Sequence, residues 1–159
     1  MSEHRLKPLL KPKSIAVLGA SRKLGSVGNE ILINLARGGF PGKLYPVNPS
    51  YEHVNDLTCY PTLASLPNTP EHVILAVADH RLEDAIDEII SIGVKACSIF
   101  SSLILIDDFE PPLKDRLKLK IKNAGLLVAG PNCLGFFNVR DHVLAGAFDT
   151  RDHFAPGNV

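Results

Sequence analysis

The sequence predicts an α/β fold, in which helices cover both faces of a doubly wound parallel sheet. Three observations support this prediction. Short apolar segments alternate along the chain with segments whose apolar residues recur at helical spacing. The apolar segments lack polar alternation, which indicates strands buried on both faces, as in parallel βαβ units. A glycine-rich loop follows the first apolar segment, which is typical of a Rossmann-like sheet.

The first half of the chain supplies two strands and one helix. Ser14–Leu18 (SIAVL) is a short apolar run bounded by a proline and a glycine, which predicts a buried strand. Over Val27–Arg37 the apolar residues fall on one helical face, and two glycines follow. Lys43–Val47 predicts the second strand, which Asn-Pro stops. Residues 50–70 contain three prolines and are expected to be irregular, with one helical turn at most.

The second half repeats the alternation. Strands are predicted at residues 72–78, 95–100 and 126–129, and helices at 82–92 and 112–124. A proline at the start of the last helix suits its first turn. We expect the domain to occupy residues 1–138. The charged tail, residues 139–159, reads as a connection toward a following domain that this chain lacks, and residues 143–148 could add a strand.

Composition limits the classes of function. The 159 residues fit one domain, and 17 Lys plus Arg balance 17 Asp plus Glu, which argues against a broadly basic nucleic-acid-binding surface. The amino-terminal stretch is too polar for a signal peptide, and no apolar run is long enough to span a membrane. Three cysteines without close spacing argue against a disulfide framework. We expect a cytoplasmic protein that binds neither nucleic acid nor membrane.

The loop GASRKLGSVG, residues 19–28, connects the first strand to the first helix. In a doubly wound sheet this position binds phosphate, because the helix N-terminus presents free N–H groups. Gly19 permits a tight turn, Gly28 permits close helix packing, and Ser21, Arg22 and Ser26 offer polar contacts. The alternative, that the glycines serve only the turn, stays open.

The loop departs from the dinucleotide pattern G-x-G-x-x-G. Its spacing is G-x5-G-x2-G, and Ser21 stands where the second glycine of that pattern would lie. The second strand ends at Asn48 without the acid that binds a ribose in NAD sites. Both departures argue against NAD.

The remaining chemistry-bearing residues are less informative. The other strand ends are small and polar, which suits backbone contact with a ligand but also ordinary turns. Cys133 lacks a neighbouring base in sequence, so we assign it no catalytic role. Six scattered histidines show no metal-ligand spacing, and no metal site is expected.

Four ordered motifs resemble one known family. They are LLKPKSIAVLGASRKLGSVG at residues 9–28, NLARGGFPGKLYPVNPSY at 34–51, CYPTLASLP at 59–67 and GPNCLGFFN at 130–138. The chain resembles the N-terminal CoA-binding domain of NDP-forming acyl-CoA synthetases, relatives of the α subunit of succinyl-CoA synthetase. The resemblance implies coenzyme A or an acyl-CoA as the ligand. The residues expected to hold it are Gly19, Ala20, Ser21, Arg22, Ser26, Val47, Asn48, Ala76, Val77, Ala78, Ser101, Ser102 and Asn132.

Two positions depart from the family. Leu103 stands where members commonly have glycine after two serines, and Ala78 stands where they often have proline. The resemblance also implies that the phosphate-carrying histidine lies in a following domain. The chain alone is therefore expected to bind CoA without completing the ligation of an acetate-CoA ligase, and its partners would be the following domains or subunits.

Three other functions remain open at this point. The same domain heads bacterial protein lysine acetyltransferases, and it also occurs as a free-standing CoA- or nucleotide-binding regulator. An NAD-binding oxidoreductase domain is the third alternative. Self-association into a homo-oligomer also stays open.

Overall fold

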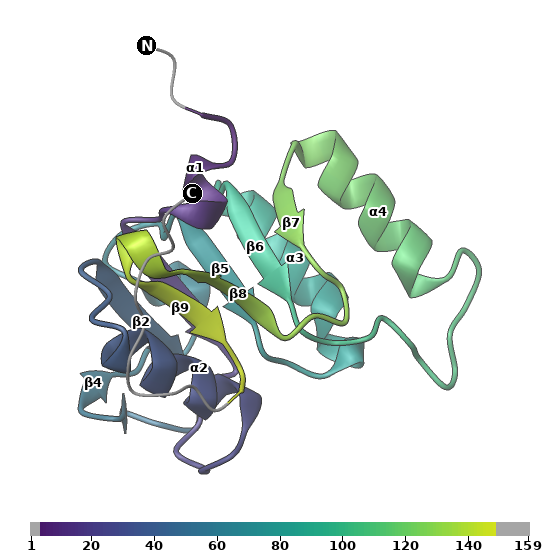
Figure 1. Ribbon diagram of the computed structural model, residues 1–159. Coiled ribbons are helices and arrows are strands. Elements are labelled where there is room, and N and C mark those ends of the chain that lie inside the picture. The colour runs from purple at the N-terminus through teal and green to yellow at the C-terminus, as the bar shows by residue number, and fades with distance from the viewer. Residues whose placement is uncertain (1–3, 149–159) are drawn as a thin grey trace.

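The computed structural model describes residues 4–148 (Figure 1). Its centre is a five-stranded parallel sheet in the order β2-β1-β5-β6-β7. The strands are β1 (Ser14–Leu18), β2 (Lys43–Val47), β5 (His72–Leu75), β6 (Ala96–Ile99) and β7 (Leu127–Ala129). Numbered along the chain, the parallel strands run 2-1-3-4-5, so the order reverses between β1 and β5. Ligands of such sheets lie outside the carboxyl ends of the strands at that switch point.

Helices cover the sheet on both faces, as the sequence predicts. They are α1 (Lys7–Leu10), α2 (Val27–Arg37), α3 (Leu82–Ser91) and α4 (Leu113–Ala124). Successive side chains of a strand point to opposite faces, so each central strand contributes to two cores. One core joins α2 to Ile15, Val17 and Ile74. The other joins α3 and α4 to Ala16, Leu18, Val73, Leu75, Cys97 and Ile99.

A small hairpin replaces part of the irregular connection expected at residues 50–70. β3 (His53–Val54) pairs antiparallel with β4 (Leu57–Thr58), and both residues of the turn, Asn55 and Asp56, have positive φ. Asparagine and aspartate tolerate that conformation better than most residues. The single helical turn follows as the 3-10 helix η1 (Leu63–Ser65).

A second hairpin joins the expected tail to the domain. β8 (Gly135–Asn138) pairs with β9 (Val143–Gly146) through the short 3-10 helix η3 (Val139–Asp141). β9 packs on α2 and is fully buried. The division expected after residue 138 thus falls between two paired strands, and it stays a prediction.

The amide of Asn34 anchors this region to α2. Its Nδ2 donates to the carbonyl oxygens of Gly146 at 2.9 Å and Phe148 at 2.8 Å. Asn34 is buried, so these bonds replace the water that the amide loses. The carboxyl half of α2 is therefore held by the end of the second hairpin.

Several boundaries differ from the sequence prediction. The strand expected at residues 72–78 ends at Leu75, and the chain then turns into the 3-10 helix η2 (Asp79–Arg81). The strands expected at 95–100 and 126–129 are each shorter at one or both ends. Within residues 4–148 no helix has the length and hydropathy to cross a membrane.

His72 ties the amino-terminal segment to the centre of the sheet. Its ring is fully buried, with Nδ1 3.2 Å from the carbonyl oxygen of Leu9 and Nε2 2.9 Å from Oγ of Ser98. The carbonyl only accepts, so Nδ1 carries the proton and Nε2 accepts from the serine hydroxyl. The Phe136 ring stacks on the imidazole, with 5.9 Å between the two ring centroids. Burial lowers the pKa of His72 to about 4 from an ordinary 6.5.

This pKa predicts a specific loss of stability in acid. Between pH 6.5 and 4 the unfolded chain binds a proton that folded His72 does not. Above pH 6.5 His72 is neutral in both states, so it causes no loss of stability. As the pH drops from 6.5 to 4, the free energy of unfolding should therefore fall by about 3 kcal/mol. Urea titrations at a series of pH values measure the slope.

His72→Gln is the control, since it removes the titrating group and should flatten this part of the pH dependence. The imidazole NMR signals of the native protein give a second readout that does not depend on the variant folding. A ring that titrates near pH 6.5 would contradict the prediction.

Candidate functional site

The carboxyl ends of β1, β2 and β5 meet at the switch point. The N–H groups of Gly19 and Ala20 both donate to the carbonyl oxygen of Val47, at 3.0 and 3.3 Å. The N–H of Ala76 donates to Leu18 at 2.9 Å. Four residues predicted from sequence, Gly19, Ala20, Val47 and Ala76, are thus brought together. Ala20 and Val47 are fully buried, so their side chains form the floor beneath the surface of the site.

Close backbone contact explains two of the loop glycines. Gly19 has φ +93°, and a Cβ there would lie 2.2 Å from the carbonyl oxygen of Ala76. A Cβ on Gly28 would lie 2.1 Å from the carbonyl oxygen of Gly19. Neither position has room for a side chain. The tight turn and the close helix packing expected from the sequence are both present.

Internal hydrogen bonds shape the loop between these glycines. The Ser21 hydroxyl accepts from the N–H of Lys23 at 3.0 Å, and the Ser26 hydroxyl donates to the Lys23 carbonyl at 2.7 Å. The Glu30 carboxylate accepts from the N–H of Gly25 at 3.0 Å. Ser26 precedes α2 but its side chain does not cap it. The first N–H groups of a helix have no partner inside the helix, and the Ser26 side chain supplies none here.

Arg22 lies on the loop surface and leans toward the first hairpin. Its Nε donates to the carbonyl oxygen of His53 at 2.7 Å, and its guanidinium carbon lies 5.4 Å from the centre of the Tyr51 ring. The side chain thus already has partners within the protein, and its phosphate contact stays a prediction. Its other two guanidinium nitrogens face no protein partner among the described residues.

Asn29 is a site residue that the sequence pattern did not single out. It is fully buried in the first turn of α2, where its Nδ2 donates to the Ser21 carbonyl at 2.8 Å and lies 3.4 Å from Oδ1 of Asn55. Its own Oδ1 has no partner among the described residues. Asn29 and Arg22 together hold the first hairpin against the loop. Both partners lie about thirty positions away, so nothing local in the sequence indicates these contacts.

Asn48 supports the loop from the end of β2. Its Nδ2 donates to the Ala20 carbonyl at 2.7 Å, and its Oδ1 accepts from the N–H of Ser50 at 2.9 Å. Both ends of the amide are therefore bonded within the protein. Asn48 lies where the sequence places it, at the end of β2, and holds the loop backbone at Ala20.

Asp79 organises the ends of β5 and β6. Its carboxylate accepts from the Ser102 hydroxyl at 3.0 Å and from the N–H of Leu103 at 2.7 Å. Nearby, the Ser101 hydroxyl donates to the Val77 carbonyl. Ala78 is exposed just before Asp79. The predicted residues of β5 and β6 thus lie side by side, joined by an aspartate that the sequence showed only as a strand end.

Leu103 takes up a backbone conformation that favours glycine. Its φ is +61°, in the left-handed region, at the position where the sequence departs from the expected Ser-Ser-Gly-Phe. The hydrogen bond from its N–H to Asp79 holds that conformation. The side chain that a glycine would lack packs against the core formed with α3 and α4.

The loop after β7 docks on the end of β6. Asn132, which also has a positive φ, donates its N–H to the Ser101 carbonyl at 2.8 Å, and its side chain is exposed. Gly130 passes so close that a Cβ would lie 2.3 Å from the Ile99 carbonyl oxygen. The Cys133 thiol lies 3.4 Å from the same oxygen. The predicted residue Asn132 therefore borders the same surface as Ser101.

These features form one continuous strip along the carboxyl ends of β2, β1, β5 and β6. A hollow of about 130 Å³ opens beside it, lined in part by Leu18, Thr62 and Val77. A larger cavity of about 920 Å³ lies elsewhere, along β7 and α4. The strip combines backbone donors, hydroxyls and one arginine, which can bind phosphate and polar groups but offers no evident nucleophile and base pair.

The comparison of sequences identifies relatives of this chain. Residues 13–138 match the family described as "CoA binding domain". The chain is 34% identical over 155 residues to the ADP-forming acetate–CoA ligase II of Archaeoglobus fulgidus, covering 97% of this chain and 23% of that protein. It is 35% identical over 144 residues to a trans-feruloyl-CoA synthase from an unknown prokaryotic organism, covering 89% and 20%. The chain spans about a quarter or less of the length of these relatives.

The fold has a solved counterpart. The dinucleotide-forming acetyl-coenzyme A synthetase 1 of Ca. Korarchaeum cryptofilum, solved with phosphate and ADP, superposes with a TM-score of 0.85 at 29% identity. The match covers 96% of this chain and 32% of that one.

The contact at Gly19 predicts a stability difference between two glycines. Gly19 and Gly93 both have positive φ, but a Cβ on Gly93 meets nothing within 4 Å. Gly93→Ala should cost about 1–2 kcal/mol for the left-handed backbone alone. Gly19→Ala should cost distinctly more, because the methyl also overlaps the Ala76 carbonyl. Urea unfolding measures both, and equal losses would show that the close approach does not constrain the loop.

Proposed function

The chain belongs to the CoA binding domain family, and we propose that it holds coenzyme A or an acyl-CoA across the carboxyl ends of β2, β1, β5 and β6. The observation that carries this proposal is the loop at residues 19–28, which Gly19 and Gly28 bring to the switch point of the sheet. The loop directs the uncapped N-terminus of α2 to the position where such sheets bind phosphates.

The phosphates of CoA would lie against the loop. The free N–H groups of the first turn of α2 and the backbone around Ala20 and Ser21 supply donors. Arg22 uses only Nε toward the hairpin, which leaves the two terminal nitrogens of its planar fork for a phosphate. Ser26 would contribute through its position before α2, since its hydroxyl is bonded to Lys23.

The rest of the ligand would follow the strip of strand ends. Val47 and Asn48 shape the nucleotide end, and Ala76, Val77 and Ala78 supply the floor beside Gly19. The pantetheine arm would continue past the remaining predicted residues toward the loop after β7. These are Ser101, Ser102 and Asn132.

The relatives favour a ligase context for this binding domain. Their names describe CoA ligation with ADP formation or CoA synthase activity, and this chain matches about a quarter or less of their lengths. We infer that the domain presents CoA to chemistry carried by other domains or subunits, which gives the ligase reading preference over a lysine acetyltransferase. No residue of this chain is assigned a catalytic role.

Isothermal titration tests the ligand and the loop together. CoA and acetyl-CoA should bind, and Ser21→Glu should weaken CoA by at least about tenfold, because a carboxylate would face the phosphates. Ser91→Glu is the matched control: it adds the same charge to an exposed position at the carboxyl end of α3 and should leave the affinity unchanged. Unchanged affinity of Ser21→Glu would remove the loop from the site.

NADH distinguishes the alternative cofactor. The second strand ends without an acidic residue, so NADH should bind far more weakly than CoA. Tight binding of NADH without binding of CoA would overturn the proposed function.

An activity assay tests whether the catalytic groups lie outside this chain. The isolated chain, given acetate, CoA and ATP, should form no acetyl-CoA above the rate without protein. Sustained turnover would show that the chain carries its own catalytic groups.

A further inference from the structure

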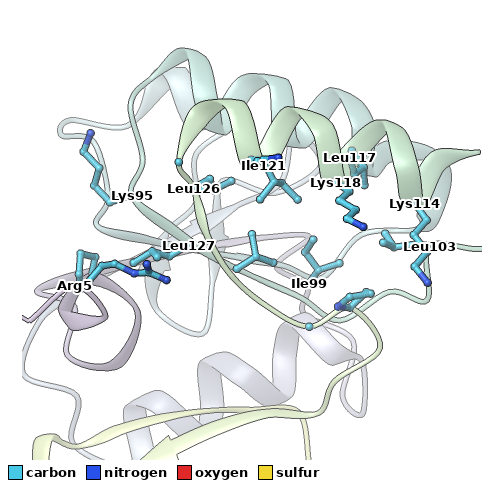
Figure 2. Close-up of a pocket in the computed structure, with 16 residues that line it drawn as sticks. Arg5, Lys95, Ile99, Leu103, Lys114, Leu117, Lys118, Ile121, Leu126 and Leu127 are labelled. Atoms are coloured by element: carbon cyan, nitrogen blue, oxygen red, sulfur yellow. The ribbon is translucent and has the colours of Figure 1, made fainter. Parts of the chain in front are cut away.

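A cavity runs along the open edge of the sheet. This β7 groove has a volume of about 920 Å³ and lies between β7 and α4 (Figure 2). It extends from Lys95 and Leu126, at the amino ends of β6 and β7, to Gly130 and Pro131 at the carboxyl end of β7. It therefore follows the strand lengthwise, whereas the proposed CoA site crosses the strand ends.

The floor of the groove is apolar. Leu117 and Ile121 of α4 lie along the groove with Ile99 and Leu126 (Figure 2). Val128 also lines it. The part of this floor that solvent reaches, at Ile121 and Val128, would gain free energy when a partner covers it.

The strand beside the groove has an unused edge. Among the described strands β7 pairs only with β6, and its three residues are all half-exposed. The N–H of Leu127 donates to the Lys95 carbonyl at 3.0 Å. In a parallel ladder alternate residues bond to the same neighbour. The N–H and C=O of Val128 consequently point away from β6, into the groove.

Positive charge follows the groove along its whole length. Five cationic residues line it and no acidic residue does; they are Arg5, Lys95, Lys114, Lys118 and Lys122. Figure 2 shows Lys114 toward one end and Arg5 and Lys95 toward the other. The chain as a whole carries no net charge, so this is a local excess.

The cationic side chains on the two sides of α4 differ in whether they form ion pairs. On the side facing α3, Arg116 pairs with Glu83 and Asp108, both at 3.0 Å, and Lys120 pairs with Asp87. The three lysines of α4 that line the groove recur every four residues. Their side chains form no ion pair or hydrogen bond with any part of the chain that the structure describes.

We propose that the β7 groove binds an extended acidic segment of a partner chain, which adds to the sheet as a strand beside β7. Backbone pairing at Val128 would give register, apolar side chains of the segment would fill the floor, and its carboxylates would meet the lysine row of α4. This is the usual division of roles when a peptide extends a sheet: main-chain bonds give affinity and side-chain pockets give specificity.

The charge pattern favours this occupant over two others. A fatty carboxylate has one anionic head and would need cations at one end only, whereas the groove carries them at both ends and along α4. A second copy of this chain would bring the same five cations to the interface, and like charges repel.

Fluorescence anisotropy with a labelled peptide tests the proposal. The probe is an eight-residue peptide that alternates Glu and Val, and its counterpart alternates Lys and Val. The Glu peptide should bind with an affinity that falls as salt rises, and the Lys peptide should not bind. Equal binding of both peptides, or of neither, would overturn the proposal.

Two matched variants localise the binding. Lys114→Gln with Lys118→Gln should weaken the Glu peptide at least about tenfold. Lys13→Gln with Lys43→Gln removes two exposed lysines on another part of the chain and should leave binding unchanged. Equal losses in the two variants would mean that the peptide responds only to total charge.

Separate experiments test the backbone pairing and the identity of the occupant. A Glu-Val peptide methylated on alternate backbone nitrogens keeps its charge but loses one row of donors, so it should bind at least tenfold more weakly; unchanged binding would exclude strand addition. Laurate and CoA should fail to displace the probe. Displacement by laurate would identify an amphiphile site, and displacement by CoA would place the cofactor in the groove, whatever titration shows at the loop.

Discussion

The close approach of three backbone segments at Gly19 sets the geometry on which the rest of the site depends. A Cβ on Gly19 would strike the Ala76 carbonyl, and one on Gly28 would strike Gly19 itself. Because neither atom exists, β1, β5 and α2 meet backbone to backbone. The N–H groups of Gly19 and Ala20 can then bond to Val47. The direction of α2, and with it the positive end of its dipole, follows from this contact.

The helix α4 shows how one element can serve stability and recognition with different residues of the same charge. Its buried residues are only Leu113 and Leu117, so its apolar contact with the core is modest. Arg116 and Lys120 add ion pairs to α3, where partly exposed pairs contribute little each. The lysines on the groove side add nothing to that contact. In our proposal, their placement serves the binding of an acidic segment rather than the packing of the helix.

Local sequence signals predict most of the fold. The features that the sequence could not show depend on contacts between positions far apart along the chain. The bounds of β1, α2 and β2 were predicted correctly, because glycine, proline and hydrophobic period mark them directly. Residues 76–78 are as apolar as β5, yet the strand ends at Leu75 and the 3-10 helix η2 follows at Asp79. The pairing of β8 with β9 and the bonds of Arg22 and Asn29 to the first hairpin join positions that no local pattern connects. The role of each predicted ligand residue stays a prediction.

The hydrogen bonds of Asn34 connect α2 to the end of the second hairpin. The amino end of the helix follows the loop at residues 19–28, and its carboxyl half is hydrogen-bonded to the carbonyls of Gly146 and Phe148. The loop at residues 19–28 and the chain at residue 148 are therefore connected through a single helix of three turns.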